Sequence, residues 1–376
     1  MCRLFALTCD DPVPPMQGIL ALDAMREGHD GSGVGLFLTD LDGPWKKHKK
    51  LPILSGIFTD AGVERLDAYM DAAGFTLRHA MDIAPEGKAP RGVPKRDRYV
   101  LRAYEPPQAW NALSELERGL GYVRVRLDLR RLGEADESAT VFSFWPDAIM
   151  IKEIGDPLHV GMYLGLDRQD LAARVMLAQG RQNTNYAINL YACHPFFIQG
   201  VASMTNGENT AFVPIREYLQ GLGVTGYEGY NSDSEVFTHI LHYTLYHLQL
   251  SVEHYKHVIT PLKAEEMDAH PDSAFLRNLS RVCRKFIIDG PNCVIGCLPD
   301  KTLFMVQDRK KLRPGVVGGR PGFYAFSSEV CGIDAAIPDR DPALDFQPMY
   351  QDTAIVTPKR TEIRICRQTH PLALQH

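Results

Sequence analysis

The chain has 376 residues and a formal net charge of −5, with 45% hydrophobic and 23% charged residues. These are globular-protein values that provide enough apolar surface for a large core, and they exclude a disordered chain. The overall charge lacks the basic footprint of proteins that bind a phosphate backbone, so we expect no nucleic-acid partner.

Targeting and membrane segments are not evident in the sequence. No stretch approaches the roughly 18 to 20 apolar residues that cross a bilayer. The first residues also lack the basic-then-apolar layout of a secretory signal. The eight cysteines are sparse for a chain of this length. We therefore expect a cytoplasmic protein with reduced thiols and no membrane association.

The first forty residues predict a strand, a helix and a glycine-rich turn. Residues 2–8 (CRLFALT) form an apolar run typical of a buried strand. Residues 16–27 carry apolar residues at helical spacing. The segment 28–39 (GHDGSGVGLFLT) begins with closely spaced glycines and ends as a strand, so its turn can bring the backbone close to another group.

The character of the sequence changes between about residues 40 and 150, which we interpret as a large insertion. It contains a basic run at 46–50 (KKHKK), a helical stretch near 60–73 and a Pro- and Arg-rich segment at 89–98. The basic run is typical of a solvated face, with docking to an acidic partner as the alternative.

The second half of the chain predicts alternating short strands and helices. Asp233 or Ser232 is the expected N-cap of the clearest helix, with Glu235 in its first turn. The other expected elements are a helix at 168–178, two strands at 186–204 interrupted by His194-Pro195, a turn at 205–209, a helix at 211–222, the capped helix at 233–249, a hairpin around 298–301, a strand at 323–327 and strands at 353–366.

Cys2 directly follows the initiator methionine. Removal of Met1 would expose a thiol and a free α-amine on one residue, and the amine, with a reference pKa near 7.7–8.0, can take the thiol proton. The alternative is a small, buried core residue on the first strand.

Four motifs follow Cys2 in a fixed order: RQNT at 181–184, CHPF at 193–196, TNGE at 205–208 and SDSEVF at 232–237. In this order and spacing the sequence resembles the class II glutamine amidotransferases. The resemblance implies an α+β fold, the four-layer αββα N-terminal-nucleophile sandwich, here with a large insertion. It covers mainly residues 2–39 and 150–335.

The resemblance also implies roles for individual residues. Cys2 is expected to attack the glutamine side-chain amide, and Asn206 with the backbone N–H of Gly207 to form the oxyanion hole. Substrate-binding roles fall to Arg181 for the α-carboxylate, to Asp233 and Glu208 for the α-ammonium, and to Thr184 and His194 at flanking positions of the pocket. No metal is expected at this site.

Taken singly, these residues have other interpretations. Arg181 could form a surface ion pair, Asn206-Gly207 a plain hairpin turn and Asp233 only a helix cap. The sequence also departs from the common family pattern, with Arg3 after the nucleophile in place of Gly, Gln179 in place of His and Ala192 in place of Asn.

A narrower resemblance is to the stand-alone glutaminase subunit of split-type glutamate synthases. It is carried by the Met-Cys-Arg start, the Gly-His-Asp-x-Ser-Gly segment, LPILSGIFTDAG at 51–62, RPGVVGG at 313–319 and FSSEV at 326–330. It implies an amidotransferase domain over 2–335, with the insertion at about 40–150, and a C-terminal extension over 336–376.

In that subfamily the ammonia passes to separate subunits, an FMN- and iron–sulfur-bearing synthase and a glycine-rich β-helical protein. We expect no cofactor in this chain itself. Cys283, Cys293 and Cys297 could form a metal or cluster site, but their sequence context is also that of apolar thiols on strands.

Other functions remain open at this point. The acceptor subunit could belong to N-methylglutamate synthase instead of glutamate synthase. The chain could also be an independent amidohydrolase acting on another amide, although the pair of Arg181 and Asp233 disfavours this. A catalytically degenerate scaffold is the third possibility, and it would be favoured if Met1 stays on the chain.

Overall fold

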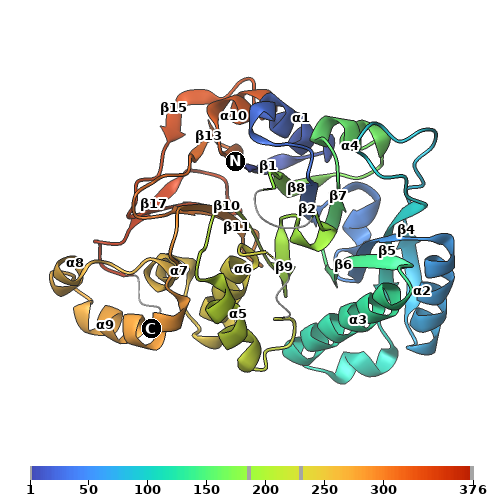
Figure 1. Cartoon of the computed structure of the whole chain (residues 1–376), viewed down its shortest axis with the longest axis horizontal. Helices are drawn as coiled ribbons and strands as arrows, with labels where there is room; N and C mark the ends of the chain where they lie inside the picture. Colours follow the sequence, from blue (N-terminus) through green and yellow to red (C-terminus); the bar gives the residue numbers. More distant parts are fainter. Residues whose placement is uncertain (1, 184–187, 228–231, 373–376) are drawn as a thin grey trace.

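Two antiparallel sheets stack face to face at the centre of the computed structural model, which describes residues 2–183, 188–227 and 232–372 (Figure 1). The first sheet has seven strands in the spatial order β15-β13-β14-β1-β8-β2-β7. Their bounds are β1 (Arg3–Val13), β2 (Val34–Leu41), β7 (Ile149–Glu153), β8 (Ala173–Gly180), β13 (Val316–Arg320), β14 (Phe323–Ser327) and β15 (Asp341–Phe346).

The second sheet has six strands in the order β17-β16-β12-β11-β10-β9. Their bounds are β9 (Phe196–Ile198), β10 (Val201–Gly207), β11 (Asn292–Cys297), β12 (Leu303–Gln307), β16 (Asp352–Val356) and β17 (Arg364–Arg367). Both sheets contribute to one buried cluster between them, for example through Leu177, Met204 and Ile295. Apolar runs such as 4–7 belong to strands that are covered on both faces.

Helices cover the outer face of each sheet, as Figure 1 shows. The seven-stranded sheet carries α1 (Met16–Ala24), α4 (Pro157–Tyr163) and α10 (Val330–Ala336). The six-stranded sheet carries α5 (Phe212–Gly221), α6 (Glu235–His242), α7 (Val252–Ile259), α8 (Ala264–Asp268) and α9 (Ser273–Val282). The predicted four-layer αββα arrangement of an α+β protein is confirmed.

Residues 52–146 form a third, smaller sheet in the order β4-β5-β3-β6. Its elements are β3 (Pro52–Phe58), α2 (Asp60–Ala72), β4 (Thr76–Ala80), β5 (Arg98–Glu105), α3 (Glu115–Ala135) and β6 (Ala139–Pro146). One face packs on α2 and α3, and the other joins the core of the sandwich through residues such as Ile53, Leu101 and Phe142. Helix α3 begins at a capping box, in which Ser114 and Glu117 satisfy each other's backbone N–H groups.

Three of the predictions about helices and strands are corrected by the structure. Residues 168–178 do not form a helix, because 173–180 is β8, paired with β1 and β2. The two strands expected within 186–204 both follow Pro195, and the described residues before it contain only a 3₁₀ turn, Leu190–Ala192. The helix expected at 233–249 begins after Ser234, which makes no side-chain capping hydrogen bond, rather than at a cap on Asp233 or Ser232, and it continues into a π-helical turn, Tyr243–His247.

The C-terminal residues extend both sheets of the sandwich. Strand β15 lies at the edge of the seven-stranded sheet, and β16 and β17 lie at the edge of the six-stranded sheet. The three cysteines that were considered as a metal or cluster site lie in different layers. Cys283 packs among the helices, whereas Cys293 and Cys297 pack between the sheets. None of the helices in the described ranges is long and apolar enough to span a membrane.

Candidate active site

Three chain segments meet where the central strands β1, β8 and β2 of the seven-stranded sheet begin or end, a place that we call the Cys2 edge. Strand β8 runs antiparallel to both β1 and β2, so its last residue, Gly180, lies opposite Arg3 on one side and Val34 on the other. Cys2 precedes β1, Arg181 follows β8, and the glycine-rich loop precedes β2. The strand register therefore places these three features side by side.

The Cys2 thiol is partly buried and is held by the backbone of Gln182. The Gln182 N–H donates to Cys2 Sγ (3.4 Å), and the thiol lies 3.7 Å from the Gln182 carbonyl oxygen, to which it donates. Burial raises the pKa of this thiol above its usual value, while the Gln182 N–H and the charge of Arg181 oppose the rise. The thiol therefore requires a base to become a nucleophile at neutral pH.

The Arg181 side chain is buried and has an unused donor. Its backbone N–H donates to the Gly33 carbonyl oxygen (2.7 Å), which fixes it beside the glycine-rich loop. Its Nη2 donates to Asn183 Oδ1 (3.2 Å), whereas Nη1 is buried without a hydrogen-bond partner in the described part of the chain. A buried guanidinium with a free N–H can take a carboxylate oxygen.

His194 connects the two sheets beside this edge. Its backbone N–H donates to Gln179 Oε1 of β8 (3.0 Å), and its Nδ1 accepts from the Thr205 N–H of β10 (3.1 Å). The bond to Pro195 is cis. Burial, with smaller contributions from Arg181 and Lys152, holds the His194 pKa well below its usual value, so the ring is neutral. It positions β10 relative to β8.

Lys152 is a functional candidate that the sequence analysis missed. It is buried on β7, and its Nζ donates to the Cys193 carbonyl oxygen (2.5 Å), next to the His194 segment. Burial lowers its pKa to about 8. A lysine that follows the apolar run 148–151 could have indicated a buried cation, because an isolated charge in a buried strand requires a partner.

Asn206 and Gly207 end β10 and do not form the turn that was expected at 205–209. Asn206 is 2% exposed, and its Nδ2 has no hydrogen-bond partner among the residues described. A Cβ at Gly207 would lie 2.3 Å from the Pro291 carbonyl oxygen. Only glycine therefore lets β10 approach this backbone so closely.

Asp233 accepts hydrogen bonds and does not cap α6. The Asn209 N–H donates to its Oδ2 (2.8 Å) and the Ser234 hydroxyl to its Oδ1 (3.3 Å). Burial raises the Asp233 pKa above its usual value, and the charge of Glu208 adds to the rise. The negative charge of Asp233 also makes a small contribution to the raised pKa of the Cys2 thiol.

Glu208 lies at the rim of this region. Its side chain is half exposed, and Arg313 Nη2 lies 3.9 Å from one carboxylate oxygen. Thr184, the remaining expected pocket residue, lies outside the described residues. The structure thus brings Cys2 beside Arg181 and Gln182, holds Asp233 on the Asn209 backbone next to Glu208, and ties His194 to β10 two residues before its end at Gly207.

Several buried donors of this region have no hydrogen-bond partner among the described residues, as is also the case at scattered positions elsewhere, such as Trp45 and Tyr104. Besides Arg181 and Asn206, the Asn209 Nδ2 is buried and unpartnered within the described ranges. Leaving such a donor unpaired costs about 1–3 kcal/mol, so its presence calls for an explanation. A small molecule with a carboxylate and a second oxygen acceptor would satisfy these donors, and Asp233 could take an ammonium group.

Comparison with known proteins gives distant likenesses. No family model matches the chain. An uncharacterized protein from Archaeoglobus fulgidus is 24% identical over 386 aligned residues, which cover 98% of this chain and 95% of that protein.

Three solved structures are similar over 97% of this chain. A glutamine phosphoribosylpyrophosphate amidotransferase from B. subtilis, complexed with ADP and GMP, has 11% identity and a TM-score of 0.46. An allosteric regulatory enzyme of purine biosynthesis has 12% identity and a TM-score of 0.49. This chain covers 49% of each of these two, so it spans about half their length. A glutamine aminotransferase class-II domain protein from Silicibacter pomeroyi, 99% covered, has 12% identity and a TM-score of 0.37. Likenesses with TM-scores and identities this low carry no argument about activity. Any proposal about the activity therefore rests on the chemistry of the site itself.

Proposed function

We propose that this chain hydrolyses L-glutamine to glutamate and ammonia, with Cys2 as the nucleophile. The supporting observation is the set of buried, unpartnered donors on Arg181 and Asn206 in a region that also contains the Cys2 thiol and the Asp233 carboxylate. The two ends of free glutamine match these groups. Arg181 would take the α-carboxylate and Asp233 the α-ammonium, which selects the free amino acid over peptides.

The reaction requires removal of Met1 and then proceeds in two halves. The Cys2 α-amine accepts the thiol proton, and the thiolate forms a bond to the side-chain amide carbon of glutamine. The Asn206 Nδ2 and the Gly207 N–H stabilise the resulting oxyanion. The C–N bond then breaks, the Cys2 ammonium supplies the proton to the leaving ammonia, and water hydrolyses the thioester to glutamate.

The ammonia would serve a partner protein. From the motifs that resemble split-type glutamate synthases, we propose an FMN- and iron–sulfur-dependent synthase-type subunit as the acceptor, together with a glycine-rich β-helical subunit. N-Methylglutamate synthase is the alternative assembly for the same glutaminase. A sheltered path between the subunits would keep ammonia from being protonated in bulk water.

The test is covalent labelling with 6-diazo-5-oxonorleucine, a glutamine-mimicking electrophile, followed by intact-mass and N-terminal peptide analysis. We expect loss of Met1 and one adduct on Cys2 that excess glutamine prevents. Cys2→Ala should abolish labelling. Cys331→Ala, which alters another partly buried cysteine, should leave it unchanged.

Other results would point elsewhere. Retained Met1 with no adduct, in the free chain and in the assembled complex, would favour a scaffold. An adduct that glutamine does not prevent would argue for an amidohydrolase acting on a different amide.

A further inference from the structure

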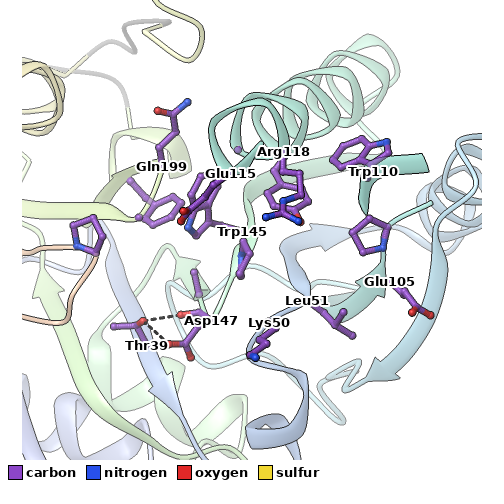
Figure 2. A pocket seen from close by; sticks show the side chains of 18 of the residues that line it. Thr39, Lys50, Leu51, Glu105, Trp110, Glu115, Arg118, Trp145, Asp147 and Gln199 are labelled. Atoms are coloured by element: carbon purple, nitrogen blue, oxygen red, sulfur yellow. Dashed lines mark hydrogen bonds between the residues drawn. The ribbon is translucent and has the colours of Figure 1, made fainter. Parts of the chain in front are cut away.

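A cavity of about 960 Å³, shown from close by in Figure 2, does not include Cys2 among the residues that line it. It opens between the sandwich and the third sheet, where Thr39 of β2, the β9–β10 turn and α3 contribute to its walls. Phe37 and Thr39, which both line the cavity, are three and five residues along β2 from Val34, which at about 3.3 Å per residue separates them from the Cys2 edge by about 10 and about 17 Å. The cavity is therefore separate from the proposed glutaminase site.

A row of aromatic side chains lines this cavity from the third sheet to the sandwich. The Trp110 and Tyr122 ring centroids are 5.5 Å apart, and those of Tyr122 and Trp145 are 5.8 Å apart. Trp145 in turn lies 6.2 Å from Phe197 of β9. Rings that pack against one another in this way have little rotamer freedom, so they form a rigid surface on which another planar ring can stack.

Most acidic groups in the cavity wall already have cationic partners. Asp147 accepts from the Lys301 ammonium (2.9 Å) and the Leu41 N–H (2.9 Å). Glu105 forms an ion pair with Arg78. Pairing within the protein therefore reduces the repulsion that these two carboxylates would exert on an anion in the cavity.

Two cations in the wall remain available. Within the described ranges, neither Lys50 nor Arg118 lies at ion-pair distance from a carboxylate. Figure 2 shows Arg118 pointing from α3 into the cavity between Trp110 and Trp145. Arg118 precedes Tyr122 by one helical turn, so its guanidinium lies on the face of α3 that carries the aromatic row. Glu115, one turn earlier, is exposed and adds an acceptor for an N–H group.

The sandwich side of the cavity is held by side-chain hydrogen bonds. His242 Nε2 on α6 donates to Gln199 Oε1 (2.6 Å), and the Tyr246 hydroxyl donates to the Gln199 carbonyl oxygen (3.2 Å). A wall fixed in this way need not reorganise when a ligand enters, which lowers the cost of binding.

We propose that this cavity is a second binding site, which takes a small organic anion bearing a planar ring. The ring would stack on Trp110 and Trp145, and the anionic group would pair with Arg118 and Lys50. The volume is at the upper end of the roughly 300–1,000 Å³ of small-molecule sites, which accommodates a molecule the size of a nucleoside monophosphate or an aromatic carboxylate.

The test is isothermal titration calorimetry on the full chain with adenosine 5′-monophosphate and 2-naphthoate. Adenosine supplies the ring without the charge, and ribose 5-phosphate supplies the charge without the ring. We expect at least one of the two planar anions to bind with a Kd below about 1 mM. Adenosine and ribose 5-phosphate should each bind about tenfold more weakly than adenosine 5′-monophosphate, or not at all. Cyclohexanecarboxylate, which has the charge without the planar ring, is the corresponding control for 2-naphthoate. Binding of only the nucleotide would identify a nucleotide site.

Substitutions of single residues test whether the ligand binds in this cavity. Arg118→Gln should weaken binding about tenfold, whereas Arg124→Gln, an exposed arginine on the same helix and outside the cavity, should not change it. If Arg118→Gln unfolds, as judged by thermal melting, Lys50→Gln replaces it. Cys2→Ala should bind as the unaltered chain does, so failure of the glutaminase proposal would leave this one standing. Lack of binding by both planar anions, or equal binding by Arg118→Gln, would overturn it.

Discussion

Asn206 has a buried amide nitrogen whose hydrogen bond is missing in the described part of the chain. Such a donor destabilises the fold by about 1–3 kcal/mol. Its retention is understandable if the donor is satisfied during a reaction, because a fixed and desolvated N–H stabilises an oxyanion more strongly than one in water. Stability and activity should therefore respond oppositely to its removal.

We predict that Asn206→Ala lowers kcat for glutamine hydrolysis about 10²–10³-fold, with a small change in KM. The free energy of unfolding should stay constant or rise, because the lost amide made no hydrogen bond through Nδ2. Steady-state ammonia release and urea denaturation measure the two quantities. Asn278→Ala, at an exposed position of α9, is the control. A parallel loss of stability and activity would mean that Asn206 is structural.

The raised pKa of Asp233 predicts how the affinity for glutamine depends on pH. Burial raises its pKa, so this carboxylate takes up a proton at a higher pH than an ordinary aspartate. As the pH falls through that raised value, the charge that attracts the α-ammonium disappears, and KM should rise. Because the folded-state pKa is the higher one, protonation of Asp233 itself favours folding, so this loss of affinity is not unfolding caused by that group.

Asp233→Asn should raise KM at neutral pH about tenfold to a hundredfold, as expected for loss of a charge-assisted hydrogen bond. It should also remove most of the rise in KM at low pH. Asp289→Asn, an exposed aspartate, should behave as the unaltered chain does. An unchanged KM in Asp233→Asn would leave the α-ammonium without its proposed partner.

At the scale of the secondary-structure elements, Gly35 on strand β2 is required by a close contact with the backbone of a neighbouring segment. A Cβ at Gly35 would lie 1.7 Å from the His194 carbonyl oxygen, which is backbone and cannot rotate away. A Cβ at Gly221, at the end of α5, would instead meet no other atom within 4 Å. The two glycines therefore serve different purposes although both lie in regular elements.

We predict that Gly35→Ala destabilises the chain by about 1–3 kcal/mol or more, because it separates β2 from the segment that holds His194. Gly221→Ala should instead stabilise it by up to about 1 kcal/mol through its greater helix propensity. Urea denaturation of both variants gives the comparison. Equal effects would contradict the close contact at Gly35.

The elements also show which parts of the fold the sequence could predict. The runs in β1 and β2 were recognisable because strands covered on both faces are continuously apolar. Strand β8 was mistaken for a helix because a short apolar run has no decisive period, and its identity comes from pairing with two neighbours far away in sequence. For the same reason, the residues expected at the site could be named, but the contacts of Asp233 with Asn209 and of His194 with Gln179 could not.

At the scale of the whole molecule, a buried ion pair joins the third sheet to the sandwich. Glu153 ends β7 fully buried, and Arg96, from the loop before β5, donates to both its oxygens (2.9 and 3.0 Å). The Tyr99 hydroxyl on β5 also donates to Glu153.

We predict that Arg96→Ala destabilises the whole chain by about 3–5 kcal/mol, because it leaves a buried carboxylate without its cation. The double variant Arg96→Met with Glu153→Gln should recover much of this loss, since neither charge then remains. Arg91→Ala, an exposed arginine in the same loop, is the control. The measurement is urea denaturation followed by both tryptophan fluorescence and far-ultraviolet circular dichroism. If the two parts unfold together, both signals give one midpoint in every variant. Separate midpoints in Arg96→Ala alone would show that this ion pair joins two units that can fold independently.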